Sequence, residues 1–452
     1  MPLGTAQQST LSHADPATLT AKFESLANNW EKGRWLSSKN RYRVDCIEKI
    51  KDDTQALGSL RHGELGSYIA ASSAIHCMDG WGYISRSMEA ELSGDIGVAR
   101  HLAYYAELRA AMSLLASAGI GVFKNIHFAL KANQECATIR GSQTHEFVWD
   151  ALEYWAELPS ATDLILKTIQ PGGRPLSEWL SHFTPTAGGA TRTILAKQWL
   201  LSWGLDLQQF ALDRETRNLS SYRPTDLIKP HYPALNQSLA FLQDFWQAHE
   251  PSALNPFKEL DRHLLRRSLS NAFKAYHHAH CGPRKVPMQY ARFVEPMLHA
   301  MLPTTGDYTN DQWKSFVCYK LHPEENKIIS YAEANHQVSS SSQHFQMISR
   351  AILLLRLATG AARENFSGIP ETDMKNLSFW WSPMGEEKGM WDTESAPNDF
   401  QDLWQDVQES LDKISSWQES GGRSKNKLFN DAAMEAKTLS TCERIGLWGL
   451  GL

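Results

Sequence analysis

Cysteine is scarce in this chain, and its spacing follows no pattern. The 452 residues include six cysteines, and no two of them form a Cys-x-x-Cys pair. Disulfide frameworks and zinc ribbons need cysteines at close, repeated intervals, so this spacing is typical of a protein from a reducing compartment. The six positions are Cys46, Cys77, Cys136, Cys281, Cys318 and Cys442. We therefore expect neither a disulfide-stabilised fold nor a cysteine-based metal site.

Long apolar runs are lacking as well. The longest one, AILLLRLATG from Ala351, is interrupted by Arg356 and is too short to cross a bilayer. The first twenty residues contain neither a basic segment nor an apolar one, unlike a secretory signal. These absences predict a cytoplasmic protein without a membrane-spanning helix.

The motifs of several common enzyme classes are also missing. We find no P-loop, no His-Glu-x-x-His, no Gly-x-Ser-x-Gly and no zinc-deaminase signature. P-loop NTPase, zinc protease and serine hydrolase chemistry are therefore not supported, and we expect no cofactor. The net charge of −5 gives no overall reason to expect a nucleic-acid coat or a membrane-surface protein.

Helical periodicity is the main positive signal. Without any repeat or βαβ alternation, it predicts a mostly α, multi-helical fold. The segment 344–358 is apolar on almost every side, so we expect it in a core. The best strand candidate is a small β-hairpin over 316–331, and 382–399 is predicted to be an exposed loop. Four segments have apolar residues at helical spacing: 195–212, 235–249, 344–358 and 400–414.

Clusters of glycine, proline and serine suggest where the chain divides. A chain of this length can form several hydrophobic cores. Breaks at 171–173, 281–287 and 339–342 contain residues that favour turns over helices. The predicted parts are an N-terminal helical extension over 1–60, a helical domain over 61–165, a middle helical and basic region over 166–335, and a C-terminal helical domain over 336–452.

The stretch from Ala103 to His145 carries the most recognisable pattern. A Tyr-Tyr-Ala sequence at Tyr104 opens a helix rich in Ala and Leu, a turn at 119–121 ends it, and Thr144-His145 opens another helix. Over roughly residues 70–160 this order resembles the HEPN superfamily of small helical domains, which occur in prokaryotic toxins and defence proteins. The resemblance implies a helical fold for this part of the chain.

The same residues fit ordinary helix packing. Adjacent side chains on a helix point about 100° apart, so at most one of Tyr104 and Tyr105 fully faces a core. Ala106, Ala110 and Ala111 allow a neighbouring helix to approach closely. The pattern therefore predicts a fold more strongly than it predicts an activity.

The resemblance implies a catalytic pair. Catalytic HEPN ribonucleases have an Arg followed after four to six residues by a His, and Arg140 and His145 satisfy that spacing. A His near neutral pKa can move the proton of a 2′-hydroxyl or of a leaving oxygen, while an Arg fork can stabilise the phosphorane charge without a metal. Gly141 departs from the polar residue usual after the Arg, which favours a degenerate domain that binds RNA. The resemblance also implies a homodimer.

Two other sets of residues compete with this pair. Arg292 and His299 have similar spacing, but a proline lies between them. Arg217-Asn218 is followed by Tyr222 in place of a His, and a tyrosine can donate to phosphate but is a poor base at neutral pH. Together with the helix over 349–360, these residues resemble the YaaC-like group of large bacterial helical proteins. A capped helix end is the alternative for 217–222.

A basic stretch is a further candidate for phosphate binding. Basic residues dominate from Lys258 to Arg292, whereas acidic residues dominate from Glu371 to Glu419. A solvated amphipathic face is the alternative interpretation. Histidines and a cysteine at 277–281 lack the second ligand cluster that zinc needs, so we expect no metal. The side chains that could follow a phosphate backbone are Arg262, Arg266, Lys274 and Arg284.

Two functions from different classes remain open. The first is a bacterial defence or stress protein that binds or cleaves RNA or nucleotides, as a homodimer or with a partner protein from the same operon. The alternative is a non-catalytic helical scaffold in a multi-protein complex of the anti-phage type. In that case the sixteen tryptophans would supply interfaces.

Overall fold

The structure is a computed structural model in which helices dominate. It describes residues 3–56, 58–182, 234–280, 289–302, 308–321, 323–333, 343–392, 395–422 and 424–452. Within these ranges the regular structure is helical apart from one small antiparallel sheet. The prediction of a mostly α, multi-helical protein is therefore confirmed.

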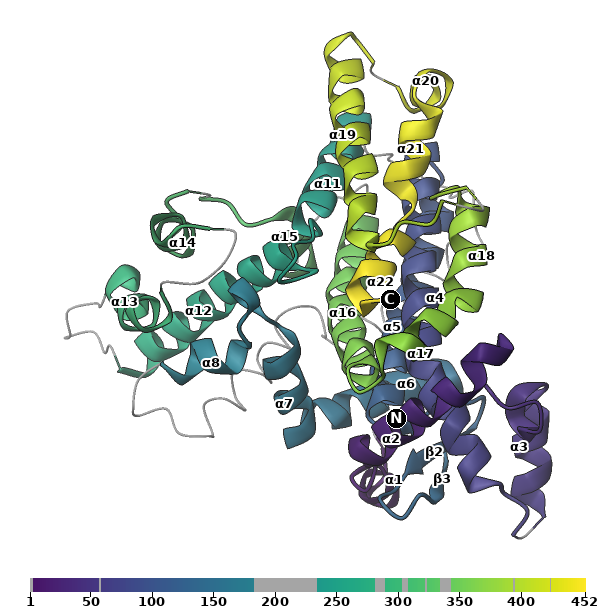
Figure 1. The fold of residues 1–452 in the computed structure, drawn as a ribbon. Helices are drawn as coiled ribbons and strands as arrows, with labels where there is room; N and C mark the ends of the chain where they lie inside the picture. Colours follow the sequence, from purple (N-terminus) through teal and green to yellow (C-terminus); the bar gives the residue numbers. More distant parts are fainter. Residues whose placement is uncertain are drawn as a thin grey trace, which may run out of the picture.

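Three long helices form the centre of the molecule: α4 (His62–Ser93), α5 (Ile96–Ser117) and α16 (Gln343–Phe366) (Figure 1). Helix α4 ends at Gly94, whose left-handed backbone (φ 88°) favours glycine. Asp95 then caps α5, because its carboxylate accepts a hydrogen bond from the Val98 amide at 3.0 Å. This short turn makes α4 and α5 antiparallel neighbours, and α16 packs against both.

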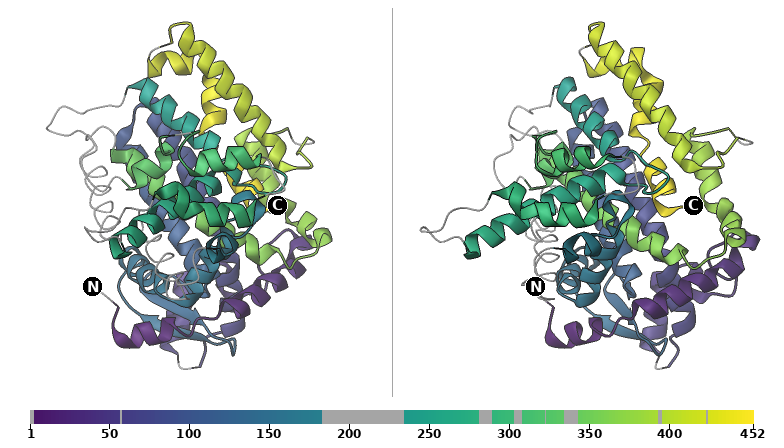
Figure 2. Two further views of the ribbon diagram at one scale, coloured as in Figure 1. Left: turned by 90° about the vertical axis from the view of Figure 1, so that its left-hand side faces the viewer. Right: turned by 60° about the vertical axis from the view of Figure 1, so that its left-hand side comes forward.

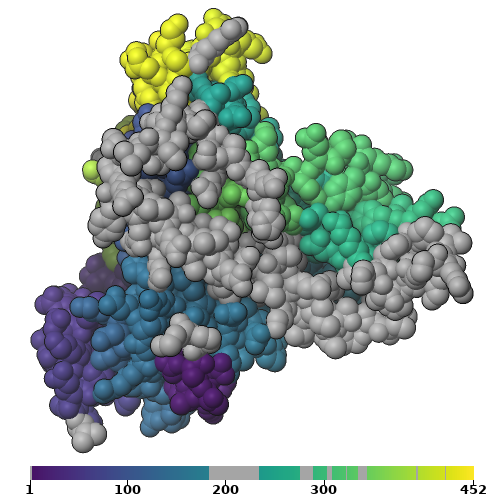
Figure 3. Space-filling view, turned by 180° about the vertical axis from the view of Figure 1, so that it is seen from behind, coloured from purple at the N-terminus to yellow at the C-terminus, as the bar shows by residue number. Residues whose placement is uncertain are grey.

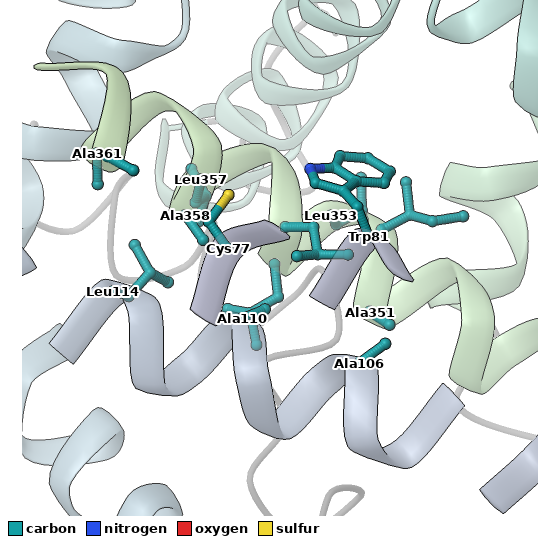
Figure 4. Close-up of a cluster of buried hydrophobic side chains, with 14 of the residues drawn as sticks. Cys77, Trp81, Ala106, Ala110, Leu114, Ala351, Leu353, Leu357, Ala358 and Ala361 are labelled. Atoms are coloured by element: carbon teal, nitrogen blue, oxygen red, sulfur yellow. The ribbon is translucent and has the colours of Figure 1, made fainter. Parts of the chain in front are cut away.

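Small side chains let the three helices approach closely. A Cβ atom added to Gly80 of α4 would lie 2.5 Å from the Leu355 side chain of α16. The buried Trp81 indole donates to the Thr359 hydroxyl at 3.0 Å, which satisfies its one polar atom. Figure 4 shows this contact region, with Cys77 and Trp81 from α4, Ala106, Ala110 and Leu114 from α5, and Ala351, Leu353, Leu357, Ala358 and Ala361 from α16.

Helix α16 is the core helix that its sequence predicts. In the described part of the chain, His344–Phe366 alone is long and apolar enough to suit a membrane span, and the whole apolar window is buried among other helices. Three buried basic side chains lie within its apolar surface, and each one is paired with a carboxylate from another helix. The pairs are His344 with Glu91 (2.7 Å), Arg350 with Glu107 (3.5 Å) and Arg356 with Asp261 (2.7 Å).

The N-terminal helices and the sheet lie at one end of this bundle (Figures 1 and 2). The strands pair in the order β1-β2-β3, with Ile126 opposite Arg140 at one end of the β2–β3 ladder. Helix α6 (Thr144–Ala156) follows the sheet and returns to α5. The other elements of this end are α1 (Thr5–Leu11), α2 (Pro16–Leu26), η1 (Ala27–Lys32), η2 (Arg41–Arg43), α3 (Cys46–Gln55), β1 (Ile120–Gly121), β2 (Ile126–Leu130) and β3 (Cys136–Arg140).

A second group of helices projects to one side of the bundle, on the left in Figure 1. Helix α12 is the long member of the group and packs against α11 and α13. The group contains α7 (Pro159–Thr168), η3 (Pro171–Gly173), α8 (Leu176–Ser181), α11 (Leu235–Ala248), α12 (Lys258–His280), α13 (Tyr290–Met301), α14 (Asn310–Val317) and α15 (Lys327–Glu333).

The C-terminal helices run along the bundle, and the α19–α20 tip lies at the end opposite the sheet, as the view from behind also shows (Figure 3). The last helix returns to the core, where it packs against α4 and α16. These elements are α17 (Glu371–Met374), η4 (Lys375–Leu377), α18 (Ser378–Lys388), η5 (Phe400–Asp402), α19 (Leu403–Glu419), α20 (Lys425–Asp431), α21 (Ala433–Ser440) and α22 (Glu443–Leu450).

The hairpin predicted over 316–331 is wrong, because its first arm is the end of a helix followed by a turn and its second arm is helical. Residues 316–317 end α14, which Thr309 caps by accepting from the Gln312 amide. The second arm begins α15, in which Ile328 and Ile329 are buried. Their β-branched side chains suggested a strand, but burial against neighbouring helices outweighs that weak preference. The sheet lies instead over 120–140.

The structure confirms two of the other predicted helices and corrects the predicted loop over 382–399. The helices over 235–249 and 400–414 are confirmed by α11 and by η5 with α19, whereas 195–212 lies outside the described residues. The exposed loop predicted over 382–399 is wrong in its first part, because α18 continues to Lys388 and ends at Gly389 (φ 67°).

The predicted division into four parts does not correspond to separate cores. Buried side chains from Leu3 to Leu450 form one contiguous hydrophobic cluster. Helices α4 and α5 belong to the part predicted over 61–165, and α16 to the part predicted over 336–452. These helices bury their apolar surfaces against one another within that cluster, and the predicted boundaries of the four parts stay a prediction.

Candidate functional site

Two adjacent tyrosines on α5 contact His145. Tyr104 is fully buried, whereas Tyr105 is half-buried, as their angular separation on a helix predicts. The Tyr104 hydroxyl lies 3.1 Å from Nδ1 of His145. The Tyr105 ring is roughly perpendicular to the imidazole, with 6.0 Å between the ring centroids. The tyrosine pair therefore orients His145 from two sides.

The loop before His145 is fixed by a second histidine. Nδ1 of the buried His127, on β2, accepts a hydrogen bond from the Phe123 amide at 3.2 Å. Its Nε2 must then carry the proton and donate to the Ser142 carbonyl at 3.0 Å. Burial lowers the pKa of His127 to about 4, so the imidazole stays neutral near pH 7. His127 thus connects the β1–β2 loop, through Phe123, to the loop after β3, through Ser142. His145 follows that second loop.

A cavity of about 430 Å³ opens between α4, α5 and these loops. Its size is within the range of small-molecule sites. Among the described residues that line it, none is acidic. Its wall carries four basic side chains that can contact an anion, His76, Arg109, Lys124 and His145, and the Tyr105 hydroxyl is a further donor.

The cavity has a polar end and an apolar end. Because α4 and α5 are antiparallel, His76 lies beside Arg109, while Tyr68 and Ala116 lie together two turns away. The Phe123 ring adds to the apolar end, with its centroid 5.8 Å from that of Tyr68. Burial raises the pKa of Tyr68 to about 12, so it remains a neutral hydroxyl. His76 and Arg109 therefore lie at the polar end, away from Tyr68.

Arg109 lies at the polar end, between a histidine and a carboxylate. Its Nη1 is 3.0 Å from Nδ1 of His76, and its Nε is 3.6 Å from the carboxylate of Asp79. A guanidinium only donates hydrogen bonds, so Nδ1 of His76 is the acceptor. Burial, together with the charge of Arg109, lowers the pKa of His76 against the opposing effect of Asp79. His76 is consequently a neutral imidazole at the cavity wall.

The structure separates the two members of the predicted catalytic pair. His145 lines the cavity, but Arg140 does not belong to its wall. Arg140 ends β3 with an exposed side chain, and its backbone carbonyl accepts from the Gln7 side chain at 2.8 Å. The four intervening residues form the turn into α6, in which the Thr144 amide donates to the Lys124 carbonyl at 3.0 Å. The arginine in the cavity with His145 is Arg109.

Several predicted site residues lie outside the described part of the chain. These are Arg217, Asn218, Tyr222 and Arg284. Arg292 and His299 are both exposed on α13 and lie away from the cavity wall. Lys274 on α12 is also exposed.

Arg262 and Arg266 do not form the exposed basic face expected of α12. Both side chains are buried and paired with carboxylates: Arg262 with Glu259 and Arg266 with Glu325, each at 2.8 Å. The Arg266 guanidinium also lies 4.3 Å from the centroid of the Phe316 ring. Such pairs and ring contacts stabilise the side group of helices, and the phosphate contacts predicted for these two arginines would require them to be broken.

Sequence reasoning missed Arg109 and His76 as members of the site. Arg109 belongs to the HEPN-like stretch, but its neighbours are packing residues. A usable signal was its position four residues after Tyr105, because residues at that spacing share one face of a helix. His76 is 33 residues away from Arg109 in the sequence, and only the antiparallel packing of α4 and α5 brings the two together.

Metal ligands are not clustered in the described residues. Within these ranges no group of three or more His, Cys, Asp or Glu side chains has the spacing of a metal site. The side chains at 277–280 and the residue Cys281 are not among those described.

Comparisons with known proteins identify no relative. Neither protein-family models, nor curated proteins, nor solved structures give a match. Membership of the HEPN superfamily therefore stays a prediction from the residues of 70–160. Any functional conclusion has to come from the chemistry of the cavity.

Proposed function

We propose that this protein binds the phosphodiester backbone of RNA in the cavity, and that His145 transfers a proton when the RNA is cleaved. The observation that carries the proposal is the presence of His145, Arg109 and His76 on one cavity wall without an acidic lining residue among those described. An imidazole can move the proton of an RNA hydroxyl, and a guanidinium can stabilise the charge of a phosphorane. No metal ion is needed for this chemistry.

The proposed roles differ in one residue from those that the sequence predicts for Arg140 and His145. Arg109 takes the role of phosphate stabiliser, because it shares the cavity with His145 whereas Arg140 lies outside its wall. Lys124 is exposed at the same cavity and adds a positive charge for the backbone. The HEPN-like pattern and the reducing-compartment spacing of cysteines support a bacterial, cytoplasmic defence or stress role, as a homodimer or with a partner protein.

The proposal is tested by RNA binding and cleavage with four single variants. We expect His145→Gln to abolish cleavage while affinity for single-stranded RNA changes by less than threefold. Arg109→Gln should weaken binding by about tenfold or more, because a hydrogen bond to a charged group contributes about 1.5–3 kcal/mol. Arg140→Gln should have a smaller effect than Arg109→Gln.

Arg86→Gln is the matched control, since Arg86 lies on α4 outside the cavity wall and stacks on Tyr83. It should bind and cleave as the wild type does. Absence of RNA binding by the wild type would refute the proposal, as would cleavage by His145→Gln at the wild-type rate. A larger loss with Arg140→Gln than with Arg109→Gln would restore the original sequence pair.

The scaffold alternative receives less support from the tryptophans than the sequence suggested. Large aromatic side chains contribute to a partner interface when they are exposed to it. Six tryptophans instead fill contacts within the chain and are fully buried: Trp30, Trp81, Trp155, Trp179, Trp246 and Trp313. A wild-type protein that binds no RNA would favour the scaffold role.

A further inference from the structure

The side chains of His76, Asp79 and Arg109, at the polar end of the cavity, all contact one another. Arg109 donates to Nδ1 of His76 at 3.0 Å, and its Nε lies 3.6 Å from the carboxylate of Asp79. The same carboxylate oxygen lies 3.8 Å from Nδ1 of His76. Arg109 and Asp79 therefore compete for one imidazole nitrogen, and Arg109 is the nearer of the two.

This arrangement fixes the tautomer of His76. Because Nδ1 accepts from Arg109, the single proton of the neutral imidazole is on Nε2. An imidazole in this form cannot take a proton at Nε2. If the imidazole of His76 turned toward Asp79, Nδ1 would have to carry the proton in order to donate it to the carboxylate. Nε2 would then be able to accept a proton. The contact with Arg109 therefore keeps His76 unsuited to act as a base.

We propose that Arg109 is an anion-operated switch on His76. A phosphodiester bound in the cavity draws the guanidinium away from Nδ1. Nδ1 then takes a proton from solvent while Nε2 releases one to it, so His76 stays neutral, donates Nδ1–H to Asp79, and offers Nε2 as the second proton-transfer atom beside His145. The inference rests on the proposed function and specifies how that site is activated.

The exposure and spacing of the three groups suit such a change. The side chains of Arg109 and Asp79 are 30% and 43% exposed, so both can move without opening the core. The 3.8 Å separation of His76 from Asp79 has to shorten by only about 1 Å to become a hydrogen bond. A phosphate oxygen offers Arg109 a charge-assisted contact that is stronger than a neutral imidazole can provide.

The other groups that face His76 do not provide an alternative trigger. Tyr68 lies on the same helix, Tyr105 on α5, Lys124 in the β1–β2 loop and His145 at the start of α6. Among the described residues that surround the cavity, Asp79 is the carboxylate within 4 Å of His76. Burial and Arg109 lower the pKa of His76 and Asp79 raises it, while the contact with Arg109 occupies the Nδ1 atom that could otherwise donate to Asp79.

The switch completes a two-histidine reaction on RNA. Tyr105, which contacts His145, and Arg109, which contacts His76, are one helical turn apart, about 5–6 Å. One histidine takes the proton of the ribose 2′-hydroxyl, the 2′-oxygen bonds to phosphorus, and the bond from phosphorus to the 5′-oxygen breaks. The other histidine protonates that 5′-oxygen. The products are a 2′,3′-cyclic phosphate and a 5′-hydroxyl, and no water or redox partner is consumed.

The first test measures the protonation of His76 directly. NMR of the full chain with ¹³C,¹⁵N-labelled histidine, assigned by comparison with His76→Gln, reports the tautomer and the pKa. In the free protein, Arg109→Gln should raise the pKa of His76, because it removes a donor to Nδ1 and a positive charge. Asp79→Asn should lower it further. No shift in either variant would refute the switch.

The second test uses a 2′-deoxy oligonucleotide, which can occupy the cavity but has no attacking hydroxyl, and whose diesters do not titrate near pH 7. With ¹⁵N-labelled histidine, binding should move the His76 proton from Nε2 to Nδ1 in the wild type, and calorimetry should show no net proton uptake, because one nitrogen gains the proton that the other loses. This change of tautomer should be absent on binding to Arg109→Gln and to Asp79→Asn. Binding without the change of tautomer would refute the switch while leaving the proposed function intact, whereas no binding would refute both.

Cleavage kinetics separate the role of His76 from a structural one. His76→Gln should lower kcat by about 100-fold or more, with KM changed less than threefold, and should remove one limb of the pH profile. His13→Gln, at an exposed histidine on the N-terminal segment, is the matched control and should leave both constants unchanged. An unaltered pH profile in His76→Gln would contradict a proton-transfer role.

Discussion

Basic side chains gather in two parts of this molecule, and the two differ in how their charges are compensated. On α12, Arg262 and Arg266 are buried and each has a carboxylate at 2.8 Å. In the cavity, the carboxylate of Asp79 lies 3.6 Å from Arg109, and none of the described residues that line the wall is acidic. The first arrangement stabilises the fold, and the second is suited to an external anion.

The difference shows why basic residues on a helix are a poor guide to phosphate binding. Arg266 looks available in the sequence, yet its partner Glu325 comes from a loop 59 residues away. Only the folded chain shows whether a carboxylate of another element already compensates a given arginine. The number of arginines on a helix face therefore predicts less than the acids that pack against it.

The largest effect is expected when a compensated arginine is removed. Arg266→Met should lower the free energy of unfolding by about 3–5 kcal/mol, because Glu325 would keep a partly buried charge without its partner. Urea denaturation followed by circular dichroism measures the change. The double variant Arg266→Met with Glu325→Gln should recover part of the loss. A loss below about 1 kcal/mol together with weaker RNA binding would instead make Arg266 a binding residue.

Acid should destabilise the protein by the next largest amount. His127 and His249 are buried, and burial lowers the pKa of each to about 4, whereas an unfolded chain binds the proton near pH 6.5. The unfolded state therefore takes up more protons between those values, and the free energy of unfolding falls as the pH drops from about 6.5 to 4. At about 1.4 kcal/mol per pKa unit, each histidine contributes about 3 kcal/mol to this fall.

Urea denaturation at a series of pH values measures the slope. His127→Gln should flatten the slope by the share of one histidine, although the variant is itself less stable at pH 7. A stability that does not decrease below pH 6.5 would mean that neither imidazole is held neutral.

A smaller effect on stability is expected for the arginine of the cavity. Arg109→Gln should change the free energy of unfolding by less than about 1 kcal/mol, because its ion pair is long and partly exposed. The same variant should weaken RNA binding strongly. Arg109→Gln should therefore affect RNA affinity more than stability, whereas Arg266→Met should affect stability more than RNA affinity. Equal losses of stability in the two variants would erase the distinction between the two parts of the molecule.

The smallest effect is expected for Lys124, whose side chain is exposed. Lys124→Gln should leave stability within about 0.5 kcal/mol of the wild type. It should lower the slope of log affinity for RNA against log salt concentration by about one unit, since one phosphate contact is lost. Lys131→Gln, on the neighbouring β2–β3 turn and outside the cavity wall, is the control. An unchanged slope would place the RNA away from Lys124.

The helical fold was predictable because long apolar patterns are local. Helices α16, α5 and α6 follow from periodicity and from the residues that end α5 and begin α6, whereas the sheet between α5 and α6 was not predicted. The segments 316–331 and 382–388 were misjudged for a different reason. Their helices depend on packing against distant parts of the chain, which neither β-branched residues nor glycine and proline reveal.

The site was predictable only in part. His145 could be singled out because Thr144 and His145 open a helix in a recognisable order. Arg140 is close to it in sequence but ends β3 with an exposed side chain outside the cavity wall, and the arginine that lines the cavity is Arg109 of α5. Asp79 and His76 join the site through the antiparallel contact of two long helices, and no spacing rule within one segment describes that contact.

The three ion pairs of α16 have a consequence for how the bundle is aligned. His344, Arg350 and Arg356 follow at intervals of six residues, which rotates each by about 240° from the one before, so the three point in directions about 120° apart. A helix of Ala and Leu alone could rotate or slide by one turn and still bury similar apolar area. Here any such shift would separate all three basic side chains from their carboxylates at once. The three pairs therefore fix both the rotation of α16 about its axis and its position along that axis.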